Sequence, residues 1–168
     1  YVFSQVGYVE EFSPLIGADV TMRNNMQFRA MYNRNRALVL GLQNYTMAED
    51  FGSEYVVGFG YIIKDLTMKF RFKGKQRTIK SDLNLKFDFS LKDNHTRITN
   101  IIDLDSQVTG GQKILGINFS ADYSFSQNLQ AKLFYNQLVS KYKISTAFPL
   151  STIRAGISLN FTFGGSSD

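Results

Sequence analysis

Few side chains in this 168-residue sequence could do acid–base or nucleophilic chemistry. It has one histidine, His95, which lies in the segment DNHT and which we interpret as an exposed residue of a turn. A catalytic site needs a nucleophile, a base and a group that orients the base. The sequence around His95 suggests no such set, so we expect the chain not to be an enzyme.

Acidic residues occur in closely spaced pairs that could in principle share a proton. Asp103 and Asp105 are two positions apart and would share one face of a strand, and paired carboxylates can do general acid–base work. They lead into a predicted external loop, however, and we interpret them as solvated loop residues. The pairs Glu10–Glu11 and Glu49–Asp50 are interpreted in the same way.

Signals for metals, phosphates and nucleic acid are weak. The chain has no cysteine, which excludes disulfides and thiolate metal sites, and no other metal-ligand spacing is present. Gly110-Gly111 has no helix behind it to hold an anion. In the basic run Lys69–Lys80, Phe70 and Phe72 alternate with cations, a pattern that could stack bases. Because such alternation is also ordinary in strands, we predict a solvated hairpin loop, with no nucleic acid, metal or cofactor bound.

A period of two dominates the chain and predicts strands. The clearest segments are residues 83–91, 115–125 and 153–163, where apolar residues alternate without a break with polar or small ones. In a helix, residues two apart lie on different faces, so these segments cannot be amphipathic helices. Weaker alternation at residues 16–22, 26–32, 38–42, 55–63, 96–102 and 129–135 brings the prediction to about nine strands. Most have about the nine to eleven residues that a tilted membrane strand needs.

Turns and longer connections separate the predicted strands. Tight turns are expected at Asn24-Asn25, Asp93-Asn94 and Ser126–Asn128, since Asn tolerates positive φ. Longer connections are expected at residues 65–81, 105–112 and 140–151. If the final strand, at about residues 152–163, runs inward, these longer connections are external and the short turns periplasmic, as in outer-membrane barrels. The connections at residues 33–36 and 46–53 do not fit this alternation of short and long.

The strands favour a barrel that spans a membrane. Mean hydropathy is only −0.17, as expected when apolar and polar residues alternate. A soluble, lipocalin-like barrel would alternate too. Long strands and the aromatic residues near their ends, such as Tyr61, Tyr123 and Phe161, favour the membrane instead. We therefore predict one all-β segment over residues 1–168, made of antiparallel transmembrane β-barrel strands, with a short tail at residues 164–168.

The polar positions of the clearest strands would face the barrel interior. They mix charged groups with small polar ones, which indicates a water-filled or protein-filled lumen rather than an apolar ligand pocket. These predicted lumen-facing residues are Asn84, Lys86, Asp88, Ser90, Asn118, Ser120, Asp122, Arg154, Ser158, Asn160 and Thr162.

Several segments resemble the C-terminal region of the SprA family. They are EEFSPLIGADVTMRNNMQFRAMYNRNRALVLGLQN, SEYVVGFGYIIKD, LNLKFDFSLKDN, QVTGGQKILGINFSADYSFSQNL and ISLNFTF, which together cover about residues 10–163. SprA-like proteins are outer-membrane translocons of the type nine secretion system, linked to gliding motility. The resemblance implies that the chain is the C-terminal portion of a very large single-chain barrel in the bacterial outer membrane.

The same resemblance implies partners and cargo. The family exports folded proteins that bear a C-terminal secretion domain, and its partners include a PorV-type barrel protein and a periplasmic plug protein. Membrane lipids and the remainder of the barrel would complete the surroundings of the chain. No catalytic residues are implied.

Two other interpretations remain open. The chain could be a complete small outer-membrane barrel that acts as an anchor or adhesin, in which case its first strand should hydrogen-bond to residues 153–163. It could also be a soluble ligand-binding barrel, which should purify without detergent.

Overall fold

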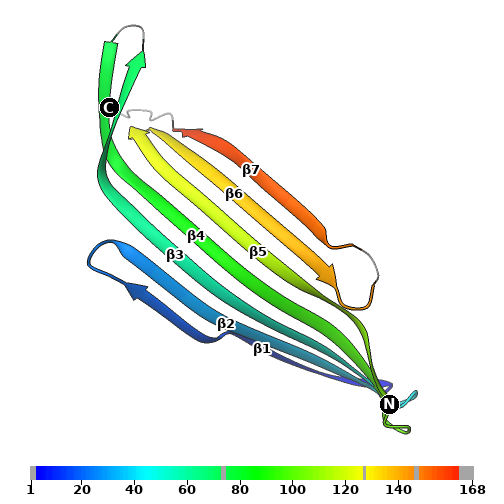
Figure 1. Ribbon diagram of the computed structural model, residues 1–168. Helices are drawn as coiled ribbons and strands as arrows, with labels where there is room; N and C mark the ends of the chain where they lie inside the picture. The colour runs from blue at the N-terminus through cyan, green and yellow to red at the C-terminus, as the bar shows by residue number, and fades with distance from the viewer. Residues whose placement is uncertain (1–2, 73–74, 127, 146–147, 163–168) are drawn as a thin grey trace, which may run out of the picture.

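A computed structural model describes residues 3–72, 75–126, 128–145 and 148–162, with the backbone alone for residues 70–77. The described chain forms one antiparallel sheet in which each strand pairs with the next along the sequence (Figure 1). Its seven strands are β1 (Gln5–Thr21), β2 (Met26–Gly41), β3 (Thr46–Phe72), β4 (Lys75–Asn100), β5 (Ser106–Ser126), β6 (Leu129–Tyr142) and β7 (Leu150–Phe161). The predicted all-β, antiparallel class is confirmed. No helix long and apolar enough to cross a membrane occurs in the described part of the chain.

The sheet is open. β1 pairs only with β2 and β7 only with β6 in the described ranges, so the first strand does not hydrogen-bond to the last. The closed small barrel considered above would need that pairing, and the sheet does not have it. Both outer strands therefore present a row of backbone N–H and C=O groups with no partner strand in this sheet.

The prediction of about nine strands is wrong, because three expected interruptions are strand interior. The expected turn at Asp93-Asn94 lies within β4, the connection at residues 33–36 within β2, and the one at residues 46–53 within β3. In each place the apolar–polar alternation stops: residues 33–36 and 93–94 are charged or amide residues, and residues 46–53 are the mixed run TMAEDFGS. That change of composition was interpreted as a turn, but cross-strand partners hold these residues in the sheet, as Asp50↔Thr96 and Ser53↔Asp93 illustrate.

The predicted long connection at residues 65–81 is also wrong. β3 and β4 continue through it as a paired hairpin, from Leu66↔Ser81 to Phe72↔Lys75, and the hairpin projects beyond the neighbouring strands (Figure 1). A bulge between Ile63 and Leu66 bends the hairpin at its base. It lies at the end of the sheet where β7 finishes, opposite to the end expected for an external loop.

With these corrections, the connections fall into two sets, one at each end of the sheet. At the end where β7 finishes, the strands are joined by the Asn24-Asn25 turn, by the hairpin tip between Phe72 and Lys75, and by the expected turn near Asn128. Asn25 has the positive φ expected of that turn, 61°. At the opposite end the connections cover residues 42–45, 101–105 and 143–149; the first has four residues, like the connection at residues 22–25, and the other two are longer. The connections expected at residues 105–112 and 140–151 are observed at residues 101–105 and 143–149. The tail at residues 164–168 lies outside the described residues.

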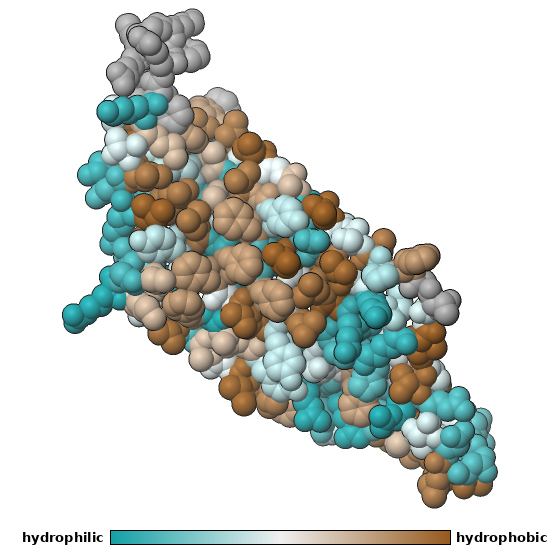
Figure 2. All heavy atoms as spheres, viewed as in Figure 1, coloured by the Kyte–Doolittle hydropathy of each residue, from teal (hydrophilic) through white to brown (hydrophobic). Residues whose placement is uncertain are grey.

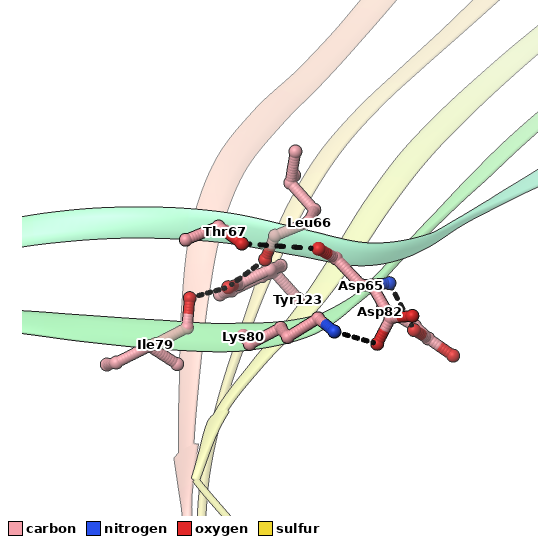
Figure 3. A network of polar contacts seen from close by, with 7 residues as sticks. All are labelled: Asp65, Leu66, Thr67, Ile79, Lys80, Asp82 and Tyr123. Atoms are coloured by element: carbon pink, nitrogen blue, oxygen red, sulfur yellow. Dashed lines mark hydrogen bonds and ion pairs between the residues drawn. The ribbon is translucent and has the colours of Figure 1, made fainter.

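The base of the β3–β4 hairpin is held by a network that reaches β5 (Figure 3). The Tyr123 hydroxyl lies 3.0 Å from the carbonyl oxygen of Leu66 and 3.3 Å from that of Ile79, so the two acceptors share its one proton. The Asp65 N–H donates to the Asp82 carboxylate at 2.9 Å, and Lys80 pairs with Asp65 at 3.2 Å. Tyr123 is the one buried large apolar residue in the described part of the chain, 5% exposed. The sheet thus has no core of its own.

Candidate membrane-facing and polar surfaces

One face of the sheet is apolar across all seven strands. Cross-strand partners point to the same side, and the register aligns the apolar members of each strand with one another, as in Val57↔Phe89 and Phe89↔Ile117. Many of these side chains are exposed, among them Val57 at 54%, Ile157 at 72% and Leu159 at 67%. Apolar residues gather over the middle of this face in Figure 2. A soluble monomer rarely exposes an apolar patch of this kind.

A row of aromatic rings crosses the middle of the apolar face. The register brings together five residues on five successive strands, Phe28↔Phe59↔Phe87↔Phe119↔Tyr135. The rings of Phe28 and Phe59 are 5.1 Å apart and tilted, a favourable geometry for aromatic pairs. The alternation predicted the face of each residue, but the row itself depends on the register, which the sequence did not reveal.

Tyrosine rings stand at both ends of the apolar stretch. Tyr32 and Tyr55 stack at 4.8 Å where the stretch gives way to charged residues. At the hairpin end, Tyr123 meets Phe125 edge to face at 5.0 Å. Tyrosine has an apolar ring and a polar tip, which suits it to the boundary between an apolar layer and water.

The opposite face is mainly polar, although Phe134 and Leu138 also lie on it, and the register brings the predicted lumen-facing residues together there. The register aligns Asn84↔Asp122↔Lys132↔Ser158 and Asp88↔Asn118↔Asn136↔Arg154. Lys86 pairs with Ser120, Ser90 with Gly116 and Asn160 with Gln130, all on this side. Thr162 lies just beyond β7, where its N–H donates to the Asn128 carbonyl at 2.9 Å. That this face lines a lumen stays a prediction.

Charges on the polar face are partly neutralised by cross-strand pairs. Arg29 donates to Asp19 at 2.9 Å, with both side chains more than half exposed. Lys132 lies 3.9 Å from Asp122. A shallow hollow beside the Arg29–Asp19 pair is floored by Gly58, where an added Cβ would come within 2.6 Å of an Asp88 carboxylate oxygen. The face is therefore of mixed charge.

A second charged surface, which the sequence analysis missed, continues the apolar face beyond Tyr32 and Tyr55. Arg36 and Glu49 form an ion pair in which the Glu49 side chain is only 8% exposed. This hydrogen bond raises the pKa of the Arg36 guanidinium above its usual value. The interpretation of Glu49 as a solvated charge is therefore wrong. Asp50, by contrast, is exposed and accepts a hydrogen bond from Thr96.

His95 belongs to this surface, and its interpretation as an exposed turn residue is wrong. It lies within β4 with its side chain 26% exposed, and its ring stacks on Phe51 at 5.1 Å. Its Nδ1 is 3.4 Å from the Lys143 amine and 3.8 Å from an Asp93 oxygen. The Phe51 ring and the Lys143–Asp93 ion pair therefore surround the imidazole, which lies within the sheet and not in a turn.

The remaining candidates for chemistry are engaged in turns and bulges. Asp103 accepts a hydrogen bond from the Asn100 amide at 2.8 Å, and Asp105 one from Gln107 at 3.1 Å, so both lie in or beside the β4–β5 turn. Gly111 lies inside β5 rather than in a connection; its φ is 146°, and an added Cβ would come within 2.5 Å of the Asn94 carbonyl oxygen. Among the described residues, no group of three His, Cys, Asp or Glu could hold a metal ion.

Comparisons with known proteins add no family. Neither a scan against protein-family models nor a search of curated proteins finds a match to this chain.

Proposed function

We propose that this chain forms part of the wall of an outer-membrane channel that exports folded proteins, as its resemblance to SprA-like translocons implies. The observation that carries the proposal is the single-layer sheet, apolar on one face, polar on the other and without a core. A sheet of this kind needs an apolar medium against one face, and lipid supplies it. Water or a passing protein would then lie against the polar face.

The open edges support a wall that extends beyond this chain. Backbone N–H and C=O groups within the hydrocarbon region of a bilayer must be hydrogen-bonded, so β1 and β7 need partner strands there. The described residues form seven strands, whereas single-chain bacterial barrels have an even number. Strands outside this chain would supply the partners.

The polar face suits the passage of folded proteins. Small polar groups and paired charges such as Arg29–Asp19 stay hydrated and offer no large apolar area to which a cargo protein would adhere. A narrow barrel would instead fill its interior with interdigitating side chains. Serine and glycine positions such as Ser90 and Gly116 would leave such an interior underpacked.

The connections suggest an orientation for the sheet. In outer-membrane barrels the longer connections are external and the short ones periplasmic. The end with the two longest connections, at residues 101–105 and 143–149, would then be external. The projecting β3–β4 hairpin would lie on the periplasmic side, where a plug protein could meet it.

Photo-crosslinking in secreting cells tests this function. A photoreactive residue at Asn118 or Asn136, in the full native polypeptide, should form adducts with secreted proteins in transit. The neighbouring positions Phe119 and Tyr135 point to the other face and should form adducts with lipid. Absence of protein adducts from Asn118 and Asn136, in cells whose outer membrane contains the protein, would contradict the proposal.

A further inference from the structure

The charged surface beyond the apolar face has an excess of positive charge. Two rows of cross-strand partners cross this surface, 34↔53↔93↔113 and 36↔51↔95. We define the cationic belt as the basic residues of these rows and of the positions next to them that lie on the same side of the sheet as the apolar face. Its members are Arg34, Arg36, Arg97, Lys113, Lys141 and Lys143. The acidic residues of the same surface are Glu10, Glu49 and Asp93. Hydrophilic residues gather beyond the apolar band toward the end of the sheet labelled N in Figure 1 (Figure 2).

The acidic residues of this surface form ion pairs with three basic residues of the belt and leave the other three without an ion pair among the described residues. Glu49 holds Arg36, while Asp93 lies 2.5 Å from the Lys143 amine and 3.8 Å from that of Lys113. Glu10 accepts a hydrogen bond from Tyr8, which raises the pKa of that phenol. The described residues form no ion pair with Arg34, Arg97 or Lys141, and all three are exposed.

The Phe51 ring lies beside two guanidinium groups of the belt. The Arg36 guanidinium carbon lies 5.4 Å from the Phe51 ring centroid and that of Arg97 5.9 Å, both within cation–π range. Arginine held in this way keeps N–H donors free for a second partner. A planar, preorganised guanidinium is well suited to bidentate contact with phosphate.

We propose that the cationic belt binds the phosphate groups of an anionic lipid headgroup in the external leaflet. The inference rests on the proposed function, because it takes the adjoining apolar face as the lipid-facing one. Side chains that follow directly on the apolar stretch, on the same side of the sheet, would then lie at headgroup depth. Their surplus charge complements a phosphorylated lipid, and basic residues beside an anionic membrane surface each strengthen binding.

The experiment uses the full native polypeptide in phosphatidylcholine nanodiscs with increasing amounts of bis-phosphorylated lipid A. Native mass spectrometry counts the lipid A molecules retained by the protein. The triple variant Arg34→Gln, Arg97→Gln, Lys141→Gln removes the three unpaired charges of the belt. Each charge should contribute about fivefold, so the triple variant should bind about a hundredfold more weakly. Dephosphorylated lipid A should not be retained by the unmodified protein.

The matched control removes the same charge from the polar face. Lys86→Gln, Lys92→Gln and Arg154→Gln change residues that form no ion pair in the described part of the chain, and retention should stay at the unmodified level. If the triple belt variant does not assemble, Lys141→Gln alone should weaken retention about fivefold. Equal retention by the belt variant and the control, or by lipid A with and without phosphate, would overturn the inference.

The same samples separate this inference from the proposed function. A lipid-phase photolabel should modify the apolar face at Phe119 in the unmodified protein. If Phe119 is labelled but the belt variant retains as much lipid A as the unmodified protein, the headgroup site alone is contradicted. If Phe119 is not labelled, the assignment of the apolar face to lipid is contradicted, and so is the inference that rests on it.

Discussion

At the scale of single residues, neighbouring positions face different environments. Phe119 and Asn118 are adjacent in β5; the first belongs to the aromatic row and the second pairs with Asp88 on the polar face. Asn118 is exposed and Phe119 half-buried, so both side chains are accessible from their own side of the open sheet. What separates them in our account is the medium, lipid on one side and water on the other.

Phe119→Arg should therefore be far more harmful than Asn118→Arg. An arginine near the middle of the lipid face costs about 2–4 kcal/mol, whereas at position 118 it would lie beside the Asp88 carboxylate and change stability little. A urea unfolding titration of the membrane-inserted protein measures both. Similar losses for the two variants would show that the two faces have been assigned to the wrong media.

At the scale of elements, the β3–β4 hairpin depends on one hydroxyl from a third strand. The Tyr123 hydroxyl contacts both strands of the hairpin base, at Leu66 and Ile79. Tyr123→Phe keeps the ring and removes the donor, which should cost about 1 kcal/mol. Amide hydrogen exchange at the hairpin base should become faster.

Tyr135→Phe is the control for this prediction. Its hydroxyl contacts the Gln137 side chain on the same strand at 3.0 Å, so its loss frees no other element. If exchange at the hairpin base is the same in both variants and in the unmodified protein, Tyr123 does not hold the hairpin.

The alternation predicted which residues share a face, and it succeeded along the apolar stretch of each strand. It failed beyond the apolar stretch, where residues such as Asp93 and Asn94 are polar on both faces of a continuing strand. Their pairing with β3 and β5 is a long-range property that local sequence does not encode. The cationic belt was missed for the same reason, since Arg34, Arg97 and Lys141 come together only through the register.

At the scale of the whole molecule, the sheet has no interior and depends on its surroundings. Its apolar face needs an apolar medium, and its two edge strands need partners. A complete small barrel would satisfy the edges by joining β1 to β7, and the sheet does not do so. The proposed larger wall would satisfy both needs and would leave the polar face beside a wide aqueous conduit.

Thiol labelling of the assembled protein tests this arrangement most directly, and the chain offers no cysteine of its own to interfere. Cysteines at Ser120 and Ser158, on the polar face, should react in intact membranes with bulky, water-soluble thiol reagents. Cysteines at the adjacent positions Phe119 and Leu159 should not, because lipid excludes the reagent. Protection of positions 120 and 158 in a folded protein would contradict the wide conduit and favour a small, filled barrel.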